Sequence, residues 1–290
     1  MKKYAICIPA SNDFALATAV LIWSLEKNFK YFKDCDIIVP YNNLNDKHKK
    51  IISRAYPSVI FKKPKDSSFY DVIPKTIYGK DNYDVYLSFE AFSQEGYEKV
   101  IYFDADMLCV QDFSEIVDLK QPMAWCSPNL GILVVGKEHI PKTYHKLIDM
   151  VRRDSKIRNH PGGDQEAVRV LFRKSSDKIK HVSKDYNFQD WGGGGKGSDQ
   201  HFLKNKDKVK VIHYSGRRKP WGKVWEGEDE DKNCARFPHM LWNSQAVKIW
   251  HDYYEQFKIY KMGVKLGPYE KYETKTGKII NDTPAGMVRI

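Results

Sequence analysis

The sequence predicts an α/β fold with a mostly parallel central sheet and helices on both faces. Apolar runs of strand length alternate with longer segments of helical spacing, so that residues 4–61 read as strand, helix, strand, helix and strand. The later run at 99–103 is apolar without alternation, as a strand buried on both faces would be. A chain of 290 residues that is 42% hydrophobic is long enough to bury such a core.

Each element has its own sequence signal. Residues 4–8 form an apolar run that ends before the turn-forming pair Ser11 and Asn12. The remaining predicted strands are at 36–39, 59–61, 99–103, 123–126, 131–135 and 208–214. The predicted helices are at 13–30, 45–56, 83–94, 142–153, from about 164, and 242–260.

The end of the chain differs from the rest. Residues 261–290 are polar and basic, carry Gly and Pro, and show no clear period. We therefore expect one domain over residues 1–260 and a basic, partly ordered tail over 261–290.

Composition narrows the class of protein. No apolar run approaches the roughly 20 residues that span a bilayer, and the N-terminal residues read as a strand instead of a signal peptide, so we expect a cytoplasmic protein. Five scattered cysteines without a Cys-x-x-Cys pair argue against a disulfide framework or a zinc site and predict buried thiols.

The formal net charge of +11 suits a phosphate-bearing partner. Because the lysines are spread along the chain, we favour a small polyanionic ligand and do not expect nucleic acid. A non-catalytic, basic nucleic-acid-binding protein that stacks bases on Trp and Tyr is the alternative from another class.

An acidic pair, Asp104 and Asp106, directly follows the most apolar predicted strand. In open α/β sheets ligands bind at the carboxyl ends of strands. Two carboxylates at such a point can turn to one Mg²⁺ or Mn²⁺ ion, which bridges protein and phosphates. An acidic turn that merely ends a strand is the ordinary alternative for a lone pair of this kind.

A second group of candidate residues comes after the predicted strand at 208–214. His213 offers one more metal ligand, and imidazole favours Mn²⁺ over Mg²⁺. Gly216 lets the backbone approach a phosphate, and Lys219 offers a cation to a departing diphosphate. Each residue alone has a structural explanation, but their spacing together favours a metal and phosphate site.

Four blocks of sequence, in order, resemble glycosyltransferase family 8 and in particular its glycogenin-like branch. They lie at 102–108, 129–135, 162–165 and 213–221, and the opening residues 5–13 fit the family's first strand and nucleotide loop. The resemblance implies a GT-A fold, which is a Rossmann-like domain. It also implies transfer of a hexose from a UDP-sugar with retention at the anomeric carbon, and Mn²⁺ as cofactor with Mg²⁺ as the alternative ion. Glucose is the first choice of hexose and galactose the second.

The resemblance also assigns roles by position. The metal ligands would be Asp104, Asp106 and His213. The nucleotide-sugar contacts would be Ser11, Asn12, Asn129, Gly216 and Lys219. Asp164 and Gln165 would face the transferred sugar beside the anomeric centre. Two routes stay open, attack from the face that UDP leaves and a covalent intermediate on Asp164.

The sequence departs from the family pattern at three points. Leu130 stands where the family has Ser or Ala, which predicts a bulky group near the sugar pocket. Tyr86 aligns with a usually basic residue, leaving Lys80 or Arg217 as substitutes for a phosphate contact. No tyrosine follows Asn187 where glycogenin carries its self-glucosylated one, so self-glucosylation is not carried over.

Other features of the sequence support weaker interpretations. The Gly-rich segment 192–198 lacks the strand and the Lys-Ser order of a phosphate-binding loop, so we interpret it as a mobile loop near the acceptor. The turn at 160–163 could instead start a helix with Asp164 as its cap. A phosphatase of the haloacid-dehalogenase kind is disfavoured because its acidic pair normally lies near the N-terminus.

The acceptor is open: a glycan, a protein side chain, a lipid-linked sugar or a small polyol. The C-terminal helix and tail, which the resemblance does not cover, leave acceptor binding, membrane-surface contact and a homodimer as alternatives.

Overall fold

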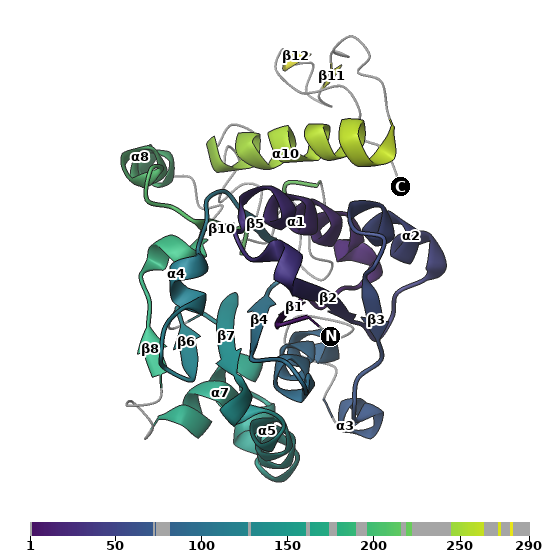
Figure 1. Cartoon of the computed structure of the whole chain (residues 1–290), viewed down its shortest axis with the longest axis vertical. Helices are drawn as coiled ribbons and strands as arrows, with labels where there is room; N and C mark the ends of the chain where they lie inside the picture. Colours follow the sequence, from purple (N-terminus) through teal and green to yellow (C-terminus); the bar gives the residue numbers. More distant parts are fainter. Residues whose placement is uncertain are drawn as a thin grey trace.

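The computed structural model describes residues 2–71, 73, 82–126, 129–160, 163–173, 179–189, 196–215, 219–221, 245–263, 272–273 and 279–280. The predicted fold class is confirmed, since a seven-stranded sheet with the order β3-β2-β1-β4-β7-β6-β8 lies between helices (Figure 1). Its strands are β1 (Tyr4–Cys7), β2 (Cys35–Pro40), β3 (Ile60–Lys62), β4 (Lys99–Phe103), β6 (Met123–Trp125), β7 (Ile132–Gly136) and β8 (Ile179–His181).

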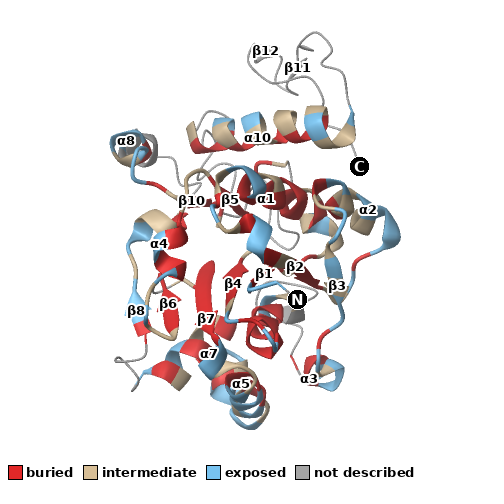
Figure 2. Cartoon of the chain, viewed as in Figure 1, coloured by how far each residue is buried: buried red, intermediate tan, exposed pale blue. Residues whose placement is uncertain are grey.

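The sheet is mostly parallel. β1 pairs in parallel with β2 and β4, β2 with β3, and β6 with β8, whereas β7 runs antiparallel to both β4 and β6. β1 and β4 are central and almost completely buried, as their unbroken apolar runs predict. The strand interiors are the most continuous buried part of the molecule (Figure 2).

Both faces of the sheet are covered, and β1 shows this residue by residue. Tyr4 and Ile6 belong to a core shared with α1 (Ala15–Asn28) and α10 (Gln245–Met262). Ala5 and Cys7 point the other way, into a core shared with η3 (Asn82–Ser93), α5 (Lys142–Arg153) and α7 (Gly163–Phe172). This alternation is what a period of two requires of a strand between two helical layers.

A second, three-stranded sheet lies beside the first and was not predicted as a unit. It consists of β5 (Met107–Cys109), β10 (Val211–His213) and β9 (Phe188–Gln189), in that order. β10 runs antiparallel to β5 and parallel to β9. This sheet therefore joins the segment after β4 to a segment about one hundred residues later.

Short elements complete the described chain. They are α2 (Asp46–Ala55), α3 (Ser67–Asp71), α4 (Ser114–Val117), α6 (Ser155–Arg158), α8 (Lys196–Asn205), η1 (Asn12–Phe14), η2 (Phe32–Asp34), η4 (Lys137–His139), η6 (Lys184–Asn187), β11 (Tyr272–Glu273) and β12 (Ile279–Ile280). α10 packs over α1, at the opposite end of the molecule from α5 and α7 (Figure 1).

Some predicted elements differ from the observed ones. The segment predicted as a helix at 13–30 divides into η1 and α1, and the one at 83–94 is a 3₁₀-helix. Part of the predicted loop at 192–198 is helical, because α8 begins at Lys196, and residues 192–195 lie outside the described residues. Most of the predicted tail also lies outside them.

Two further expectations concern cysteines and membranes. The four described cysteines, Cys7, Cys35, Cys109 and Cys126, are buried free thiols, as predicted, and burial raises the pKa of each thiol. Among the described helices, none combines the length and the apolar character that a membrane crossing requires.

Candidate active site

The acidic pair lies at the carboxyl end of β4, as predicted. Asp104 is the first residue after β4, and its backbone N–H donates to the carbonyl of Gly131 at 2.8 Å. Asp106 immediately precedes β5. The chain thus passes from the large sheet to the small one within three residues, and both carboxylates lie at this junction.

His213 reaches the same point through the small sheet. It ends β10 and is paired with Met107 across the antiparallel ladder, while the backbone N–H of Tyr214 donates to the Asp106 carbonyl at 2.9 Å. The imidazole Nε2 consequently lies 3.1 Å from Asp106 Oδ1 and 3.6 Å from Asp104 Oδ2.

The three groups fit a hard or borderline divalent ion. One ligand atom each from Asp104, Asp106 and His213 lies within 4.8 Å of the others. Two carboxylate oxygens and one imidazole nitrogen are a donor set typical of Mn²⁺. Mg²⁺ prefers sites whose ligands are all oxygen atoms. The structure therefore brings together all three predicted metal-ligating residues in one buried or half-buried cluster.

Lys219 lies in the same cluster. Its Nζ atom is 2.6 Å from Asp106 Oδ2 and donates to the Tyr214 carbonyl at 2.7 Å. Burial by itself raises the pKa of Asp106, but the charges of Lys219 and His213 reverse this and hold the pKa well below its usual range. Asp106 is therefore ionised and is already neutralised by the ammonium group when no metal is bound.

Asp104 behaves differently from its neighbour. Burial and the Asp106 charge raise the pKa of Asp104, although His213 and a hydrogen bond from Tyr102 at 2.5 Å oppose the shift. Two carboxylates share one low-dielectric pocket, and among the described residues Lys219 forms its ion pair with Asp106 and acts on Asp104 only through its charge. The negative charge of Asp104 is thus less well compensated by nearby positive charge than that of Asp106.

The loop with Ser11 and Asn12 lies against the Lys219 segment. Trp221 donates from Nε1 to the Asp13 carbonyl at 3.1 Å, and its ring meets Phe14 edge to face at 5.5 Å. Asn12 is fixed in turn, because its Oδ1 accepts from the backbone N–H of Asn45 at 2.9 Å. The predicted nucleotide loop therefore borders the metal cluster.

Asp164 is buried in the first turn of α7, with 4% of its surface exposed. α7 begins at Gly163, so Asp164 lies in its first turn, where its carboxyl accepts hydrogen bonds from backbone N–H groups, including that of Gln165. Burial and, to a smaller extent, the Asp104 charge raise the pKa of Asp164 to about 8, against the Ser88 hydroxyl and backbone N–H groups. Gln165 follows it and is half-buried.

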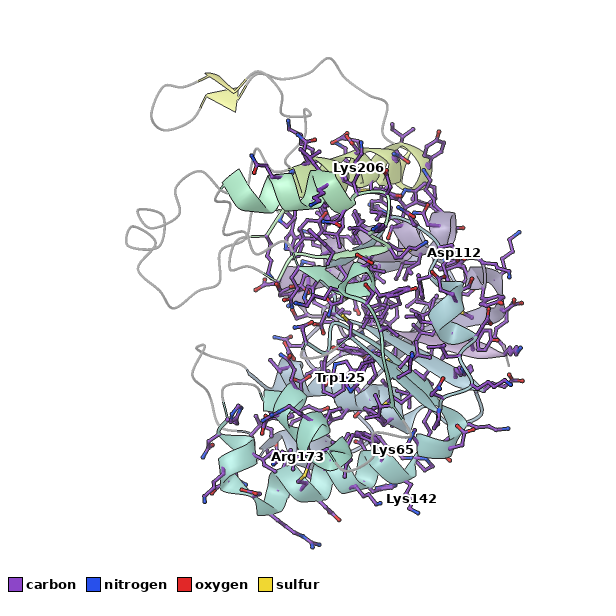
Figure 3. The ribbon with its side chains drawn as sticks, turned by 90° about the vertical axis from the view of Figure 1, so that its left-hand side faces the viewer. Lys65, Asp112, Trp125, Lys142, Arg173 and Lys206 are labelled. Carbon is purple, nitrogen blue, oxygen red and sulfur yellow. The ribbon has the colours of Figure 1, made fainter. Side chains whose placement is uncertain are left out.

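Asn129 is held at the edge of the cluster. Its Oδ1 accepts from the backbone N–H of Gly131 and from Asn187 Nδ2, both at 2.7 Å. Its carbonyl accepts from Trp125 Nε1 at 2.9 Å, and Trp125 is labelled in Figure 3. Asn187 was missed from the sequence, yet its Oδ1 lies 2.9 Å from His213 Nδ1.

Leu130, which the sequence predicts near the sugar pocket, is a core residue in the metal-free chain. Its side chain is 2% exposed and belongs to the core formed with η3, α5 and α7. Tyr86 is also buried, and its hydroxyl donates to the Arg158 carbonyl at 3.1 Å. Gly216, Lys80 and Arg217 lie outside the described residues.

A family model gives the site its context. The model of Glycosyl transferase family 8 matches residues 5–127 and 129–224, which is well over half of the chain. The chain belongs to this family.

Curated relatives of this family 8 chain include glycogenins. Mouse (Mus musculus) glycogenin-1 is 22% identical over 262 residues, which are 87% of this chain and 75% of the relative. The uncharacterised protein R707 of Acanthamoeba polyphaga mimivirus is 22% identical over 281 residues, covering 86% of this chain and 95% of the relative.

Solved structures share the fold. The galactosyltransferase LgtC in complex with donor and acceptor sugar analogues superposes with a TM-score of 0.63 at 12% identity, over 87% of this family 8 chain and 95% of LgtC. The glycosyltransferase GlyE of Streptococcus pneumoniae TIGR4 superposes with a TM-score of 0.58 at 18% identity, over 87% of this chain and 61% of the GlyE chain. These similarities support the GT-A fold.

Proposed function

We propose that this chain is a retaining hexosyltransferase that uses a UDP-sugar as donor and Mn²⁺ as cofactor. The observation that carries the proposal is the convergence of Asp104, Asp106 and His213, with Lys219 beside them, at the carboxyl end of β4. Glucose is the first candidate for the transferred sugar and galactose the second. Membership of family 8 supports transfer of a glycosyl group.

The donor set supports a metal-dependent mechanism. A divalent ion held by the two carboxylates and the imidazole would offset the charge that develops on the UDP leaving group. Mg²⁺ is the alternative ion, because the cluster holds two oxygens and a single nitrogen.

Lys219 supplies the second positive charge. In the metal-free chain its ammonium group is bonded to Asp106. If a metal ion takes over Asp106, the same group would become available to the diphosphate of the donor. Gly216 would let the backbone approach the same phosphates. Because Trp221 ties this segment to the loop of Ser11 and Asn12, the nucleoside and the diphosphate would be held by adjacent parts of the chain.

Asp164 supports one of the two routes. With a pKa of about 8 its carboxyl is mostly protonated at neutral pH in the metal-free chain. A neutral carboxyl is a poor nucleophile but donates a hydrogen bond to a sugar hydroxyl. This favours attack by the acceptor from the face that UDP leaves, with Asp164, Gln165 and Asn129 positioning the sugar.

The test is release of UDP from a panel of UDP-sugars without any acceptor. We expect slow hydrolysis of one donor with Mn²⁺, loss of activity with EDTA, and loss of activity in Asp106→Ala. Asp149→Asn is the matched control, because Asp149 is an exposed aspartate on α5.

The proposal fails if no UDP-sugar is hydrolysed and calorimetry detects no Mn²⁺-dependent binding of UDP. The nucleic-acid-binding alternative then predicts affinity for DNA or RNA that falls steeply with salt and is unaffected by UDP. Panels of glycans, peptides and small polyols, added to the donor that is hydrolysed, identify the acceptor class by an increased rate.

A further inference from the structure

A buried chain of hydrogen bonds ends on the candidate metal ligand His213. It starts at the backbone N–H of Gly131, passes through the side chains of Asn129 and Asn187, and reaches His213 Nδ1. Asn187 and His213 are 3% and 2% exposed. Water therefore has little access to the inner part of this chain, and its donors and acceptors must satisfy one another.

The direction of every bond in this chain follows from its first donor. A backbone N–H can only donate, so the Asn129 atom that receives it from Gly131 is the side-chain oxygen. The Asn187 atom 2.7 Å from that oxygen must then be the amide nitrogen, since two oxygens would repel each other. The other terminal atom of Asn187 is consequently its oxygen, which can only accept.

The last step concerns the imidazole of His213. Its Nδ1 lies 2.9 Å from the Asn187 oxygen, so Nδ1 carries a proton and donates it. Without a metal, Nε2 lies 3.1 Å from Asp106 Oδ1 and donates a hydrogen bond to it, so Nε2 also holds a proton. When a metal ion displaces that proton, the proton on Nδ1 stays and the lone pair of the neutral ring is on Nε2. This is the tautomer that a metal ion at the two aspartates requires.

We propose that Asn187 is a positioning residue that fixes His213 in its Nδ1-protonated tautomer and so presents Nε2 to the metal. The inference rests on the proposed metal-dependent function and assigns a role to a residue outside the ligand set. Histidine ligands of metals generally donate their other N–H to a fixed acceptor, which sets the ring's orientation and raises its basicity.

The backbone holds the acceptor in place. Asn187 ends η6 and directly precedes β9, whose residues Phe188 and Gln189 pair with Ile212 and His213 of β10. The backbone of Gly131 packs against the same edge of the ring, because a Cβ atom there would lie 2.6 Å from His213 Nδ1. The hydrogen-bond direction is therefore set by three separate segments of the chain.

The first test reads the tautomer directly. Nitrogen-15 NMR of the metal-free protein in EDTA should show a protonated Nδ1 in His213 of the wild type. In Asn187→Leu, which lacks the acceptor, the neutral ring should carry its proton on Nε2 and donate to Asp106. An unprotonated Nδ1 in the wild type overturns the inference whether or not the protein binds a metal.

The second test measures the affinity of the protein for Mn²⁺ alone, by calorimetry without donor. Asn187→Leu should weaken binding about 10- to 100-fold, the usual effect of losing a partner of a metal ligand. Circular dichroism and thermal unfolding show whether each variant is folded.

A double-mutant cycle separates positioning from a general structural role. In a His213→Ala background, Asn187→Leu should have little further effect on Mn²⁺ affinity, because the residue through which it acts is gone. An undiminished loss in that background overturns the inference. A wild type that shows the expected tautomer but binds no Mn²⁺ instead contradicts the metal-dependent function.

Discussion

Replacing Asp164 with Asn should make the protein more stable, and increasingly so as the pH rises from 5 to 8. The folded chain holds the pKa of this carboxyl at about 8, against an ordinary value of 3.8. Well below pH 4 the group is protonated in both the folded and the unfolded chain and does not change the free energy of unfolding. Between the two values the unfolded chain releases the proton while the folded chain keeps it, so stability falls.

The magnitude follows from the two pKa values. Each pKa unit corresponds to about 1.4 kcal/mol, so the cost to the wild type is about 2 kcal/mol at pH 5 and about 5 kcal/mol at pH 8. Asn has a similar shape and no proton to release. The difference in the free energy of unfolding between Asp164→Asn and wild type should therefore grow by roughly 3 kcal/mol over this range.

Denaturant unfolding of both proteins in EDTA, at several pH values from 5 to 8, measures this difference. Comparing the two proteins at each pH cancels the contributions of all other titrating groups. Asp149→Asn is the control, because that side chain is 58% exposed and should give a difference that does not change with pH. Parallel curves for wild type and Asp164→Asn would refute the argument that Asp164 is held in its neutral form.

Three further predictions test the surroundings of the metal cluster. Gly131→Ala should destabilise the fold by about 1 to 3 kcal/mol in denaturant unfolding and weaken Mn²⁺ binding, because the added methyl group would meet the His213 ring. Wild-type stability together with wild-type Mn²⁺ affinity would contradict the close approach of Gly131 to His213. Lys219→Met should leave the affinity for Mn²⁺ equal or higher, because it removes the cation that competes for Asp106. It should weaken the binding of UDP in the presence of Mn²⁺ by about 1.5 to 3 kcal/mol, measured by calorimetry. An unchanged affinity for UDP would exclude a contact between Lys219 and the phosphates. Leu130→Ser should cost at least about 2 kcal/mol of stability without changing which UDP-sugar is hydrolysed, whereas a changed donor would place Leu130 in the pocket.

The parts of the fold with a clear hydrophobic period were predictable from sequence. α5 occupies the predicted residues 142–153, because its buried Tyr144, Leu147, Ile148 and Val151 recur at helical spacing. β8 and β9 were missed for the opposite reason. β8 has three residues, of which only Ile179 is buried, and β9 has two, so neither is long enough to show a pattern. Their existence depends on pairing with distant strands.

The same distinction applies to the candidate site. Asp104, Asp106 and His213 were found because each lies at or beside the end of an apolar strand, where sequence and topology together indicate a ligand. Asn187 follows a polar 3₁₀-turn, and nothing in its neighbours indicates a role until the pairing of β9 with β10 is known. Leu130 is 2% exposed, and the sequence alone did not indicate this burial because the residue lies outside the predicted strand at 131–135.

The charges of the cluster explain why so many of its groups are buried. A site that must hold a diphosphate and a divalent ion needs strong fields, and burial strengthens each charge interaction. The same burial makes the uncompensated carboxyls costly, which is seen in the raised pKa values of Asp104 and Asp164. Asp106 avoids this cost because Lys219 and His213 lie beside it. A cation at the cluster would stabilise the ionised form of Asp104, one of its ligands, so the destabilised carboxyl there favours binding. The pKa of Asp164 is raised mainly by its own burial, so its neutral form does not depend on the cluster being empty.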